Sequence, residues 1–333
     1  MTKTTAKLKR DNFWERNRKS NGYLLRKTVG SFFFKLFRAV LLAGMAFIIL
    51  QPVLNKISIS FMAEQDIYDP TIVSVPVHFT SANYQLCAGF MDYFKTLGNT
   101  FLISGTVALL QVAMCTLVGY GFARFKFPLK KLWFAFVMMT VIVPPQTIAT
   151  SLHLHFRYFD IFGIIELISG KTLNLRGSVL PYYLMSAGCM GLKNGLYIYM
   201  IRQFFRNVPN DVEEAAYVDG CGMFKTFYRI MLRDSVPIVT SCFLFAFVWQ
   251  WTDGFYSRLF LGKISLLARQ LQSVGERLGN YMVYTLFVGP PSTNYVQCII
   301  ATGTLMVVVP IIIVYLFAQK GFVESLSSTG VKM

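Results

Sequence analysis

Five residues of this sequence are of types and in places that could bind a solute. Lys193 and Asn194 interrupt one long apolar run, and Trp249, Trp251 and Asp253 close another. A sugar packs its C–H faces on aromatic rings and offers its hydroxyls to polar groups, so aromatic faces beside hydrogen-bonding groups suit a carbohydrate. These five residues are therefore candidates for the lining of a solute pathway.

Each candidate also has a purely structural interpretation. An intramembrane lysine is costly, so Lys193 either faces a cavity or pairs with a carbonyl or carboxylate for packing alone. Interfacial tryptophans also form the aromatic belt of a membrane protein. The double proline Pro144-Pro145 must break a helix, and the freed carbonyls need protein or water around them. It is either a simple kink or a further part of the pathway, and these alternatives stay open.

The groups that a catalytic or metal site needs do not converge in this sequence. There is no G-x-x-x-x-G-K-[ST] loop to cradle ATP phosphates. His153 and His155 are two apart and would not share a helix face, and the six cysteines contain no C-x-x-C pair. We therefore expect a non-enzymatic chain with no catalytic residue, no metal site and no cofactor of its own.

The composition is that of a polytopic membrane protein. Of 333 residues, 54% are hydrophobic and only 14% are charged, which is unlike a soluble globular domain. The net charge of +16 does not indicate nucleic-acid binding, because Lys and Arg cluster beside apolar segments, as the positive-inside rule requires. We expect an all-α membrane protein in contact with lipid and not with nucleic acid.

Six apolar segments are predicted to cross the membrane, which needs roughly 20 residues per helix. They are 39–61, 99–122, 132–152, 179–205, 236–250 and 295–318. The basic arm 1–38, the loop 207–233 and the tail 319–333 are placed in the cytoplasm, and the segments 62–97, 153–177 and 254–296 outside. Counted over the arm 1–38, the loop 123–131, Arg202 and Arg206, the loop 207–233 and the tail, the inner side carries 22 Lys and Arg, against 8 in the outer segments, so both termini are predicted to be cytoplasmic. The outer segment 62–97 is expected to be irregular and partly extended.

A polar island, residues 207–233, interrupts the apolar pattern. Pro209 suits a first helical position, and Gly220 suits the residue that ends a helix. Acidic residues crowd the opening turns, where they meet the positive end of the helix dipole. A second amphipathic helix is predicted from the spacing of Phe224, Phe227, Tyr228 and Met231. Two short helices hinged at a glycine on the cytoplasmic side would make a docking element.

This island resembles the EAA loop of ABC importer permeases. The residues that carry the resemblance are Glu214-Ala215-Ala216, Asp219-Gly220 and, after nine intervening residues, Ile230-Met231-Leu232. In that family the loop is cytoplasmic and sits in a groove of the ATPase subunit. Arg233 stands where the family usually has proline, with Pro237 four residues on, which leaves the bend after the second helix in question.

Other stretches of the chain resemble the carbohydrate-uptake (maltose-type) branch of this family. The matching stretches are Asn99-Thr100-Phe101, 119–128, 321–324 and 329–332, so the resemblance covers most of residues 99–333. The double proline and the tryptophan-and-acid cluster also fit the branch. Residues 1–98 add only a plausible first span.

The resemblance implies the membrane permease subunit of an ATP-driven importer in the cytoplasmic membrane of a prokaryote. Residues 98–318 would be the permease core, and the cargo an oligosaccharide or related glycoside. It further implies a second, usually different, permease subunit, two ATPase subunits that bind ATP and Mg, and an external solute-binding protein. In this resemblance, Glu214 and Asp219 would make polar contacts to the ATPase, and Ala215 and Ala216 would allow close packing against it. Gly220 would be the hinge between the two helices. Phe224 would belong to the same coupling set.

Three other functions were considered. A stand-alone secondary transporter or channel predicts paired intramembrane charges and an internal repeat, of which the sequence offers only Lys193. A membrane-embedded enzyme needs convergent acidic, histidine or serine groups. An importer permease for a polyamine, phosphate or peptide stays an alternative for the cargo.

Overall fold

The computed structural model describes residues 18, 20–69, 71–72, 75–262 and 264–330, with the backbone alone for Leu24 and residues 320–330. The chain divides into two compact units, one ending at Ser58 and one beginning at Ile59. Most of the predicted basic arm before residue 20, and the last three residues of the predicted tail, lie outside the described residues.

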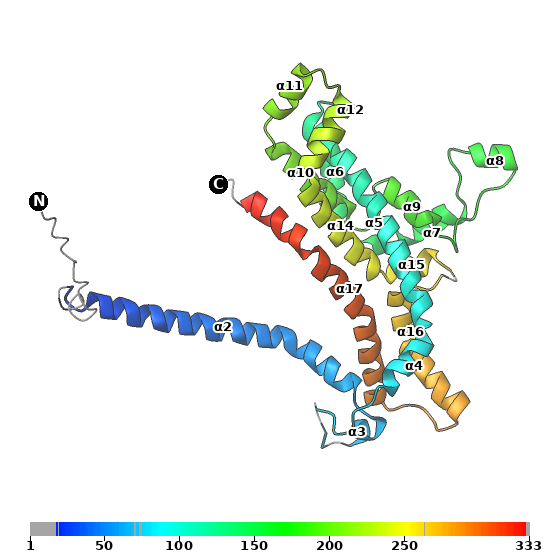
Figure 1. Ribbon diagram of the computed structural model, residues 1–333. Helices are drawn as coiled ribbons and strands as arrows, with labels where there is room; N and C mark the ends of the chain where they lie inside the picture. Colours follow the sequence, from blue (N-terminus) through cyan, green and yellow to red (C-terminus); the bar gives the residue numbers. More distant parts are fainter. Residues whose placement is uncertain (1–17, 19, 70, 73–74, 263, 331–333) are drawn as a thin grey trace, which may run out of the picture. The chain divides into compact units, whose positions relative to one another are not determined.

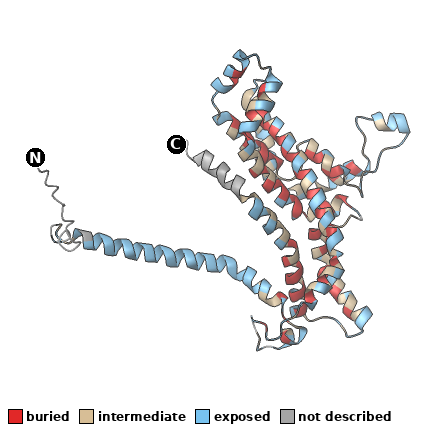
Figure 2. Cartoon of the chain, in the orientation of Figure 1, coloured by how far each residue is buried: buried red, intermediate tan, exposed pale blue. Residues whose placement is uncertain are grey.

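The first unit is dominated by one helix, α2 (Tyr23–Ser60), which includes Pro52. Its large apolar side chains are exposed along almost its whole length (Figure 2). A helix that exposes this much apolar surface suits a lipid environment. The predicted first span, 39–61, is confirmed as helix, and the helix begins well before it.

The second unit is helical, and its described residues contain only isolated strand-like bridges. Figure 1 shows the arrangement of its elements, which are α3 (Glu64–Tyr68), α4 (Ala82–Met91), α5 (Tyr93–Arg124), α6 (Lys130–Ile142), η1 (Pro145–Ile148), α7 (Ala149–Arg157), α8 (Ile164–Ser169), α9 (Leu180–Ala187), α10 (Asn194–Asn207), α11 (Asp211–Val218), α12 (Met223–Thr226), η2 (Phe227–Met231), α13 (Leu232–Asp234), α14 (Val236–Trp251), α15 (Phe255–Phe260), α16 (Leu267–Asn280), η3 (Tyr281–Leu286) and α17 (Thr293–Gly330).

Helix α5 lies at the centre of this unit. It packs against α9, α10 and α14, while α17 packs against α4, α14 and α16. Buried side chains on the facing sides of these helices form one continuous core, drawn red in Figure 2. A smaller core joins α7, α9 and α15 to the first half of α5.

Two glycines allow helices of this core to approach closely. A Cβ on Gly119 of α5 would lie 2.9 Å from Ile201 of α10. A Cβ on Gly195 of α10 would lie 2.6 Å from the Val137 carbonyl oxygen of α6. Small residues at such contacts are typical of membrane helices, where van der Waals packing replaces the hydrophobic effect as the cause of association.

The described helices confirm part of the predicted span pattern. α2, α5 and α17 are long and apolar enough to cross a membrane. The helix pairs 130–157 and 223–251 meet the same test together, with bends of 99° and 73°, which brings the possible spans to five. The count of six stays a prediction.

The predicted fourth span, 179–205, is not one helix. The chain leaves the helical conformation between α9 and α10, where Cys189 and Lys193 have φ of 55° and 60°. Gly188 and Gly191 in the same segment weaken a helix further. Lys193, which was expected within a membrane span, therefore stands at a break in the backbone.

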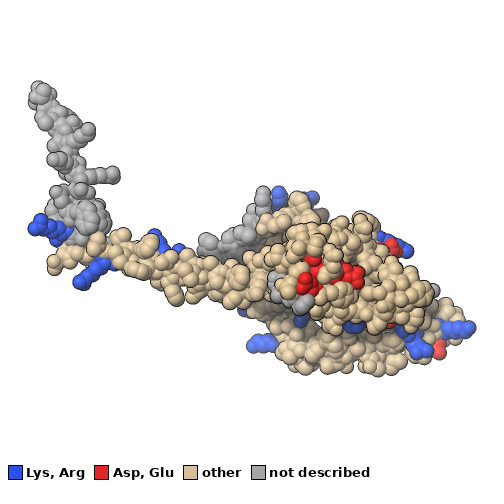
Figure 3. Space-filling view, turned by 90° about the horizontal axis from the view of Figure 1, so that it is seen from below, with Lys and Arg blue, Asp and Glu red and all other residues tan. Residues whose placement is uncertain are grey.

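The segment 62–97 is more helical than expected, because it includes α3, α4 and the start of α5. Figure 3 shows acidic side chains gathered around α3. Within this group Asp66 is buried and accepts hydrogen bonds from the backbone N–H groups of Val77 and His78 and from the His78 ring. Burial raises the pKa of Asp66, but these hydrogen bonds outweigh it and the net pKa lies below the usual value.

We predict that Gly195→Ala destabilises the protein by roughly 1–3 kcal/mol, because the added methyl overpacks the contact between α10 and α6. The thermal unfolding midpoint of the purified protein in detergent is the measurement. The matched control is Gly98→Ala in α5, where a Cβ meets no atom within 4 Å and which should leave the midpoint unchanged or raise it. Equal midpoints for the two variants would contradict the close contact.

Candidate functional site

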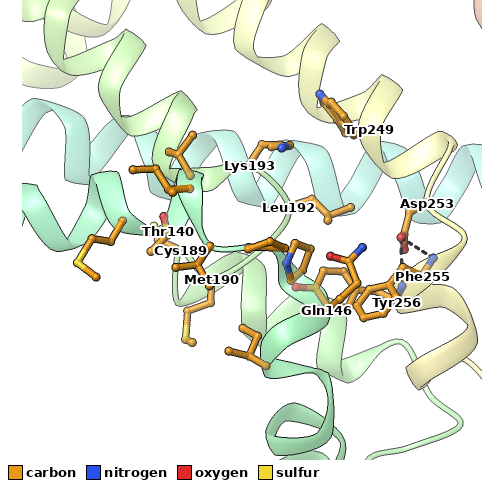
Figure 4. A pocket seen from close by; sticks show the side chains of 18 of the residues that line it. Thr140, Gln146, Cys189, Met190, Leu192, Lys193, Trp249, Asp253, Phe255 and Tyr256 are labelled. Carbon is orange, nitrogen blue, oxygen red and sulfur yellow. Dashed lines mark hydrogen bonds between the residues drawn. The ribbon is translucent and has the colours of Figure 1, made fainter.

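A cavity of about 700 Å³ opens where three interruptions of the helices meet (Figure 4). Its walls are residues 139–146 and 148 from the α6–η1 break, residues 189–193 from the α9–α10 break, and residues 249 and 252–256 from the end of α14. Non-helical backbone inside an apolar environment is tolerated where it lines a cavity or is covered by protein. The three breaks together therefore mark a candidate solute site.

The first break is at the double proline. Pro144 is extended, with φ of −65° and ψ of 137°, and Pro145 begins η1. The helix direction changes by 99° across this point. The predicted break is confirmed, and both prolines lie on the cavity wall.

The second break carries Lys193 to the cavity wall. The ammonium group of Lys193 lies 5.0 Å from the ring centroid of Trp249. Both side chains are labelled in Figure 4. A cation over an aromatic face at this distance is attracted by the ring quadrupole. The Trp249 side chain is 45% exposed, so part of its surface is left for a solute.

Asp253 lines the cavity, but its carboxylate is already occupied. It accepts hydrogen bonds from the Tyr182 hydroxyl at 2.5 Å and from the backbone N–H groups of Phe255, Tyr256 and Ser257 at 3.0–3.1 Å. The residue is 7% exposed. Asp253 therefore holds the first turn of α15 against α9 and has little capacity left for cargo.

Two of the predicted pathway residues lie behind the wall. Trp251 is 1% exposed, and its indole N–H donates to the Val307 carbonyl of α17 at 3.0 Å. Residues two apart on a helix point roughly 200° apart, which is why Trp249 and Trp251 cannot share one face. Asn194 is 2% exposed and interacts through its side-chain oxygen with Gln111.

Gln111 was missed by the sequence analysis. It is fully buried in the middle of α5. Its side-chain nitrogen donates to the Leu192 carbonyl at 2.5 Å and to the side-chain oxygen of Asn194. Its side-chain oxygen accepts a hydrogen bond from Gln250 at 3.3 Å. One amide side chain thus serves a carbonyl that the α9–α10 break frees. A lone glutamine within the apolar run 99–122 was the available signal.

The polar island forms the predicted helix–glycine–helix element. α11 ends at a Schellman cap, in which the N–H groups of Cys221 and Gly220 donate to the carbonyls of Ala216 and Tyr217. Gly220 has φ of 77°, which confirms its place after the helix end. Pro209 is not the first helical residue as predicted, because it precedes the flanking residue Asn210.

The second helix of this element is not regular. Residues 227–231 are π-helical, which changes the spacing of side chains from that of an α-helix. Phe224 and Tyr228 are exposed while Met231 is fully buried, so the predicted stripe is divided between two faces. A bend of 73° follows at Ser235, so the bend is present although Arg233 replaces the usual proline.

The coupling set named from the sequence is exposed for the most part. Glu214, Ala215, Asp219 and Phe224 are exposed, as Gly220 is, whereas Ala216 packs into the chain's own interior at 4% exposure. Exposed apolar groups beside acidic ones form a surface suited to another protein.

Glu213 anchors α11 to the end of α5, a contact that the sequence analysis did not find. Its carboxylate accepts from the Tyr120 hydroxyl at 3.0 Å and lies 3.2 Å from Nε of Arg124. Arg124 also donates to the Val208 carbonyl at 2.8 Å and to the Asn210 side chain. In the described part of the chain, no three His, Cys, Asp or Glu side chains are grouped to hold a metal.

Comparison with known proteins gives the family context for this site. Residues 115–323 match the family described as "Binding-protein-dependent transport system inner membrane component". The chain is 26% identical to the maltodextrin transport system permease protein MdxG of Bacillus subtilis (strain 168), over 73% of this chain and 80% of that protein. It is 30% identical to the maltose/maltodextrin transport system permease protein MalG of Escherichia coli (strain K12), over 71% of each.

A solved structure shares the fold. It is the crystal structure of a bacterial ABC transporter involved in the import of the acidic polysaccharide alginate. One of its chains matches with a TM-score of 0.66 at 17% identity, covering 87% of this chain and 97% of that one.

We predict that Asp253→Ala lowers the thermal midpoint, because each buried donor left unpaired costs about 1–3 kcal/mol. Thr252→Ala is the control, since Thr252 is exposed and its hydroxyl bonds only within its own helix. An Asp253→Ala protein with an unchanged midpoint and impaired solute uptake would contradict the structural role and return Asp253 to the cargo site.

Proposed function

Because the chain belongs to the family of binding-protein-dependent transport system inner membrane components, we propose that it is the permease subunit of an ABC importer that moves a carbohydrate. It is a multi-pass protein of the inner membrane. The relatives named for maltodextrin and maltose transport support an oligosaccharide or related glycoside as the cargo class.

The observation that carries the proposal is the cavity at the three helix breaks. It presents the exposed part of the Trp249 ring beside polar groups, which is the combination that binds a sugar. The Lys193 ammonium lies over the Trp249 ring and helps to hold the ring in this orientation. A cavity that opens alternately to each side of the membrane, as the breaks re-pack, would carry the solute across.

The energy source in this proposal is a pair of separate ATPase subunits, which bind ATP and Mg. The exposed surface of α11 and α12, with Glu214, Asp219 and Phe224, is where an ATPase subunit would dock. Gly220 at positive φ would let the two helices turn relative to one another. A second permease subunit, different from this one, and an external solute-binding protein complete the assembly.

The test is to purify the tagged chain from its native membrane in mild detergent and to identify the proteins that accompany it. An ATPase subunit and a second multi-span protein are expected. Glu214→Arg should remove the ATPase, because a reversed charge at the docking surface opposes a complementary partner. Lys95→Glu reverses an exposed charge near the start of α5, at the opposite end of that helix from the contact with α11, and should retain it. A chain that arrives alone, where other assemblies of the same membrane survive, would favour a stand-alone transporter.

We predict that Trp249→Ala weakens carbohydrate uptake, raising KM roughly three- to tenfold for the loss of about 0.5–1.5 kcal/mol of ring contact. Uptake of labelled oligosaccharides, beginning with maltotriose, is the measurement. Trp249→Phe should retain most of the activity. Trp133→Ala removes another exposed tryptophan that does not line the cavity and serves as the control. Equal effects at residues 133 and 249 would indicate a membrane-belt role for both.

A further inference from the structure

Helix α5 holds α10 at both of its ends. At the start of α10, the Gln111 side chain donates to the Leu192 carbonyl and to the side-chain oxygen of Asn194, the first residue of the helix. Just after α10 ends, the Arg124 guanidinium donates to the Val208 carbonyl and to Asn210. Both sets of contacts come from one helix, and both reach residues that flank the same neighbour.

The two helices are also in close contact between these ends. Gly119 of α5 lies against Ile201 of α10, with no room for a Cβ. α5 is a continuous helix without proline from Tyr93 to Arg124. Gln111 and Arg124 are therefore separated by roughly 20 Å of rigid helix, at 1.5 Å per residue. The pair α5–α10 has the contacts of one rigid body.

This rigid body connects the docking helix to the cavity. At one end, Tyr120 and Arg124 hold the buried carboxylate of Glu213 on α11. At the other end, the segment held by Gln111 is the α9–α10 break, which carries Lys193 to the cavity wall. A displacement of α11 would be passed to α5 through Glu213, and to the cavity wall through Gln111.

Other routes between the same two places are less rigid. From α11 the chain reaches α14 through the turn at Gly220, the π-helical residues 227–231 and a 73° bend. Each of these can absorb a displacement locally. The backbone route through α10 depends on the three residues 208–210, and two of them are those that Arg124 binds.

We infer that the α5–α10 pair transmits movement of the docking helix to the cavity, with Gln111, Tyr120, Arg124 and Glu213 as the positioning residues. This rests on the proposed function, since it assigns a route between the proposed docking surface and the proposed solute cavity. None of the four touches solute in this role. Their effect is on whether the cavity wall follows α11.

A native thiol reports on the cavity wall. Cys189 lies in the α9–α10 break, lines the cavity and is half-buried. Cys221 is the other half-buried thiol, and the remaining four are buried. In a Cys221→Ser background, the rate at which a fluorescent maleimide labels this chain therefore measures exposure of the cavity wall, without any need to know the cargo.

The experiment uses the assembled transporter with its partner subunits in nanodiscs, without nucleotide and with ATP plus vanadate. Nucleotide should change the rate of Cys189 labelling at least threefold. Gln111→Leu and Glu213→Gln should bring this ratio close to one while ATP hydrolysis continues. Tyr120→Phe, which removes one hydroxyl, should give an intermediate ratio. Glu276→Gln makes the same chemical change at an exposed acid of α16, outside the docking surface and the cavity wall, and should keep the full ratio.

The outcomes separate transmission from simple structural support. If Gln111→Leu and Glu213→Gln keep the full ratio of Cys189 labelling rates with and without nucleotide, the inference is overturned, even when their melting temperatures fall. The inference is also overturned if the unsubstituted transporter gives a ratio of one. If Glu213→Gln or Gln111→Leu fails to assemble, Tyr120→Phe decides, and a full ratio in that variant overturns the inference. Failure of the proposed function is recorded separately, by the absence of an ATPase subunit from the purified assembly.

Discussion

Every backbone N–H and C=O group in an apolar environment needs a partner, and the arrangement of this protein depends on that constraint. The chain breaks its helices at Pro144, before Lys193 and after Trp251, and each break frees carbonyls. The three breaks lie around one cavity, and the Gln111 side chain binds the Leu192 carbonyl at one of them. In the proposed function, carbonyls freed at these breaks would also be partners for a hydroxylated solute, because a sugar hydroxyl can donate to a peptide carbonyl.

A second dependence follows from the first. In the proposed transmission, helices that are broken at the cavity would pass on movement less directly than an uninterrupted neighbour. α5 is continuous and packs against α9, α10 and α14. Its glycine at residue 119 brings α10 close enough for side chains at both ends of the contact to reach the neighbouring backbone. Close packing and polar contacts thus together hold α5 against α10. This is usual in a membrane, where lipid is as apolar as the protein core and the hydrophobic effect does not drive helix association.

The sequence predicted the features that local chemistry determines. Gly220 ends α11 at positive φ as expected, and the double proline breaks the chain as expected, because both effects depend on one or two residues. It did not predict which side of a helix faces the cavity. Nothing in the sequence distinguished Trp249 from Trp251, yet of the two only Trp249 lines the cavity. Asp253 looked like a cargo ligand, but its carboxylate binds the backbone N–H groups of the next helix start, two to four residues on, and the Tyr182 hydroxyl, which is 71 residues earlier.

The residues that were missed share one property, which is that their partners are distant in sequence. Tyr120 and Arg124 meet Glu213 about ninety residues later, and Gln111 meets residues about eighty later. No periodicity within a helix encodes such a pairing. The acidic residues 213 and 214 were read as part of one charged turn, whereas the fold separates them: Glu213 is buried against α5 and Glu214 is exposed. In the proposed assembly, α11 would therefore contact its own membrane core through one acid and the ATPase subunit through the other, and this division would let one element respond to both.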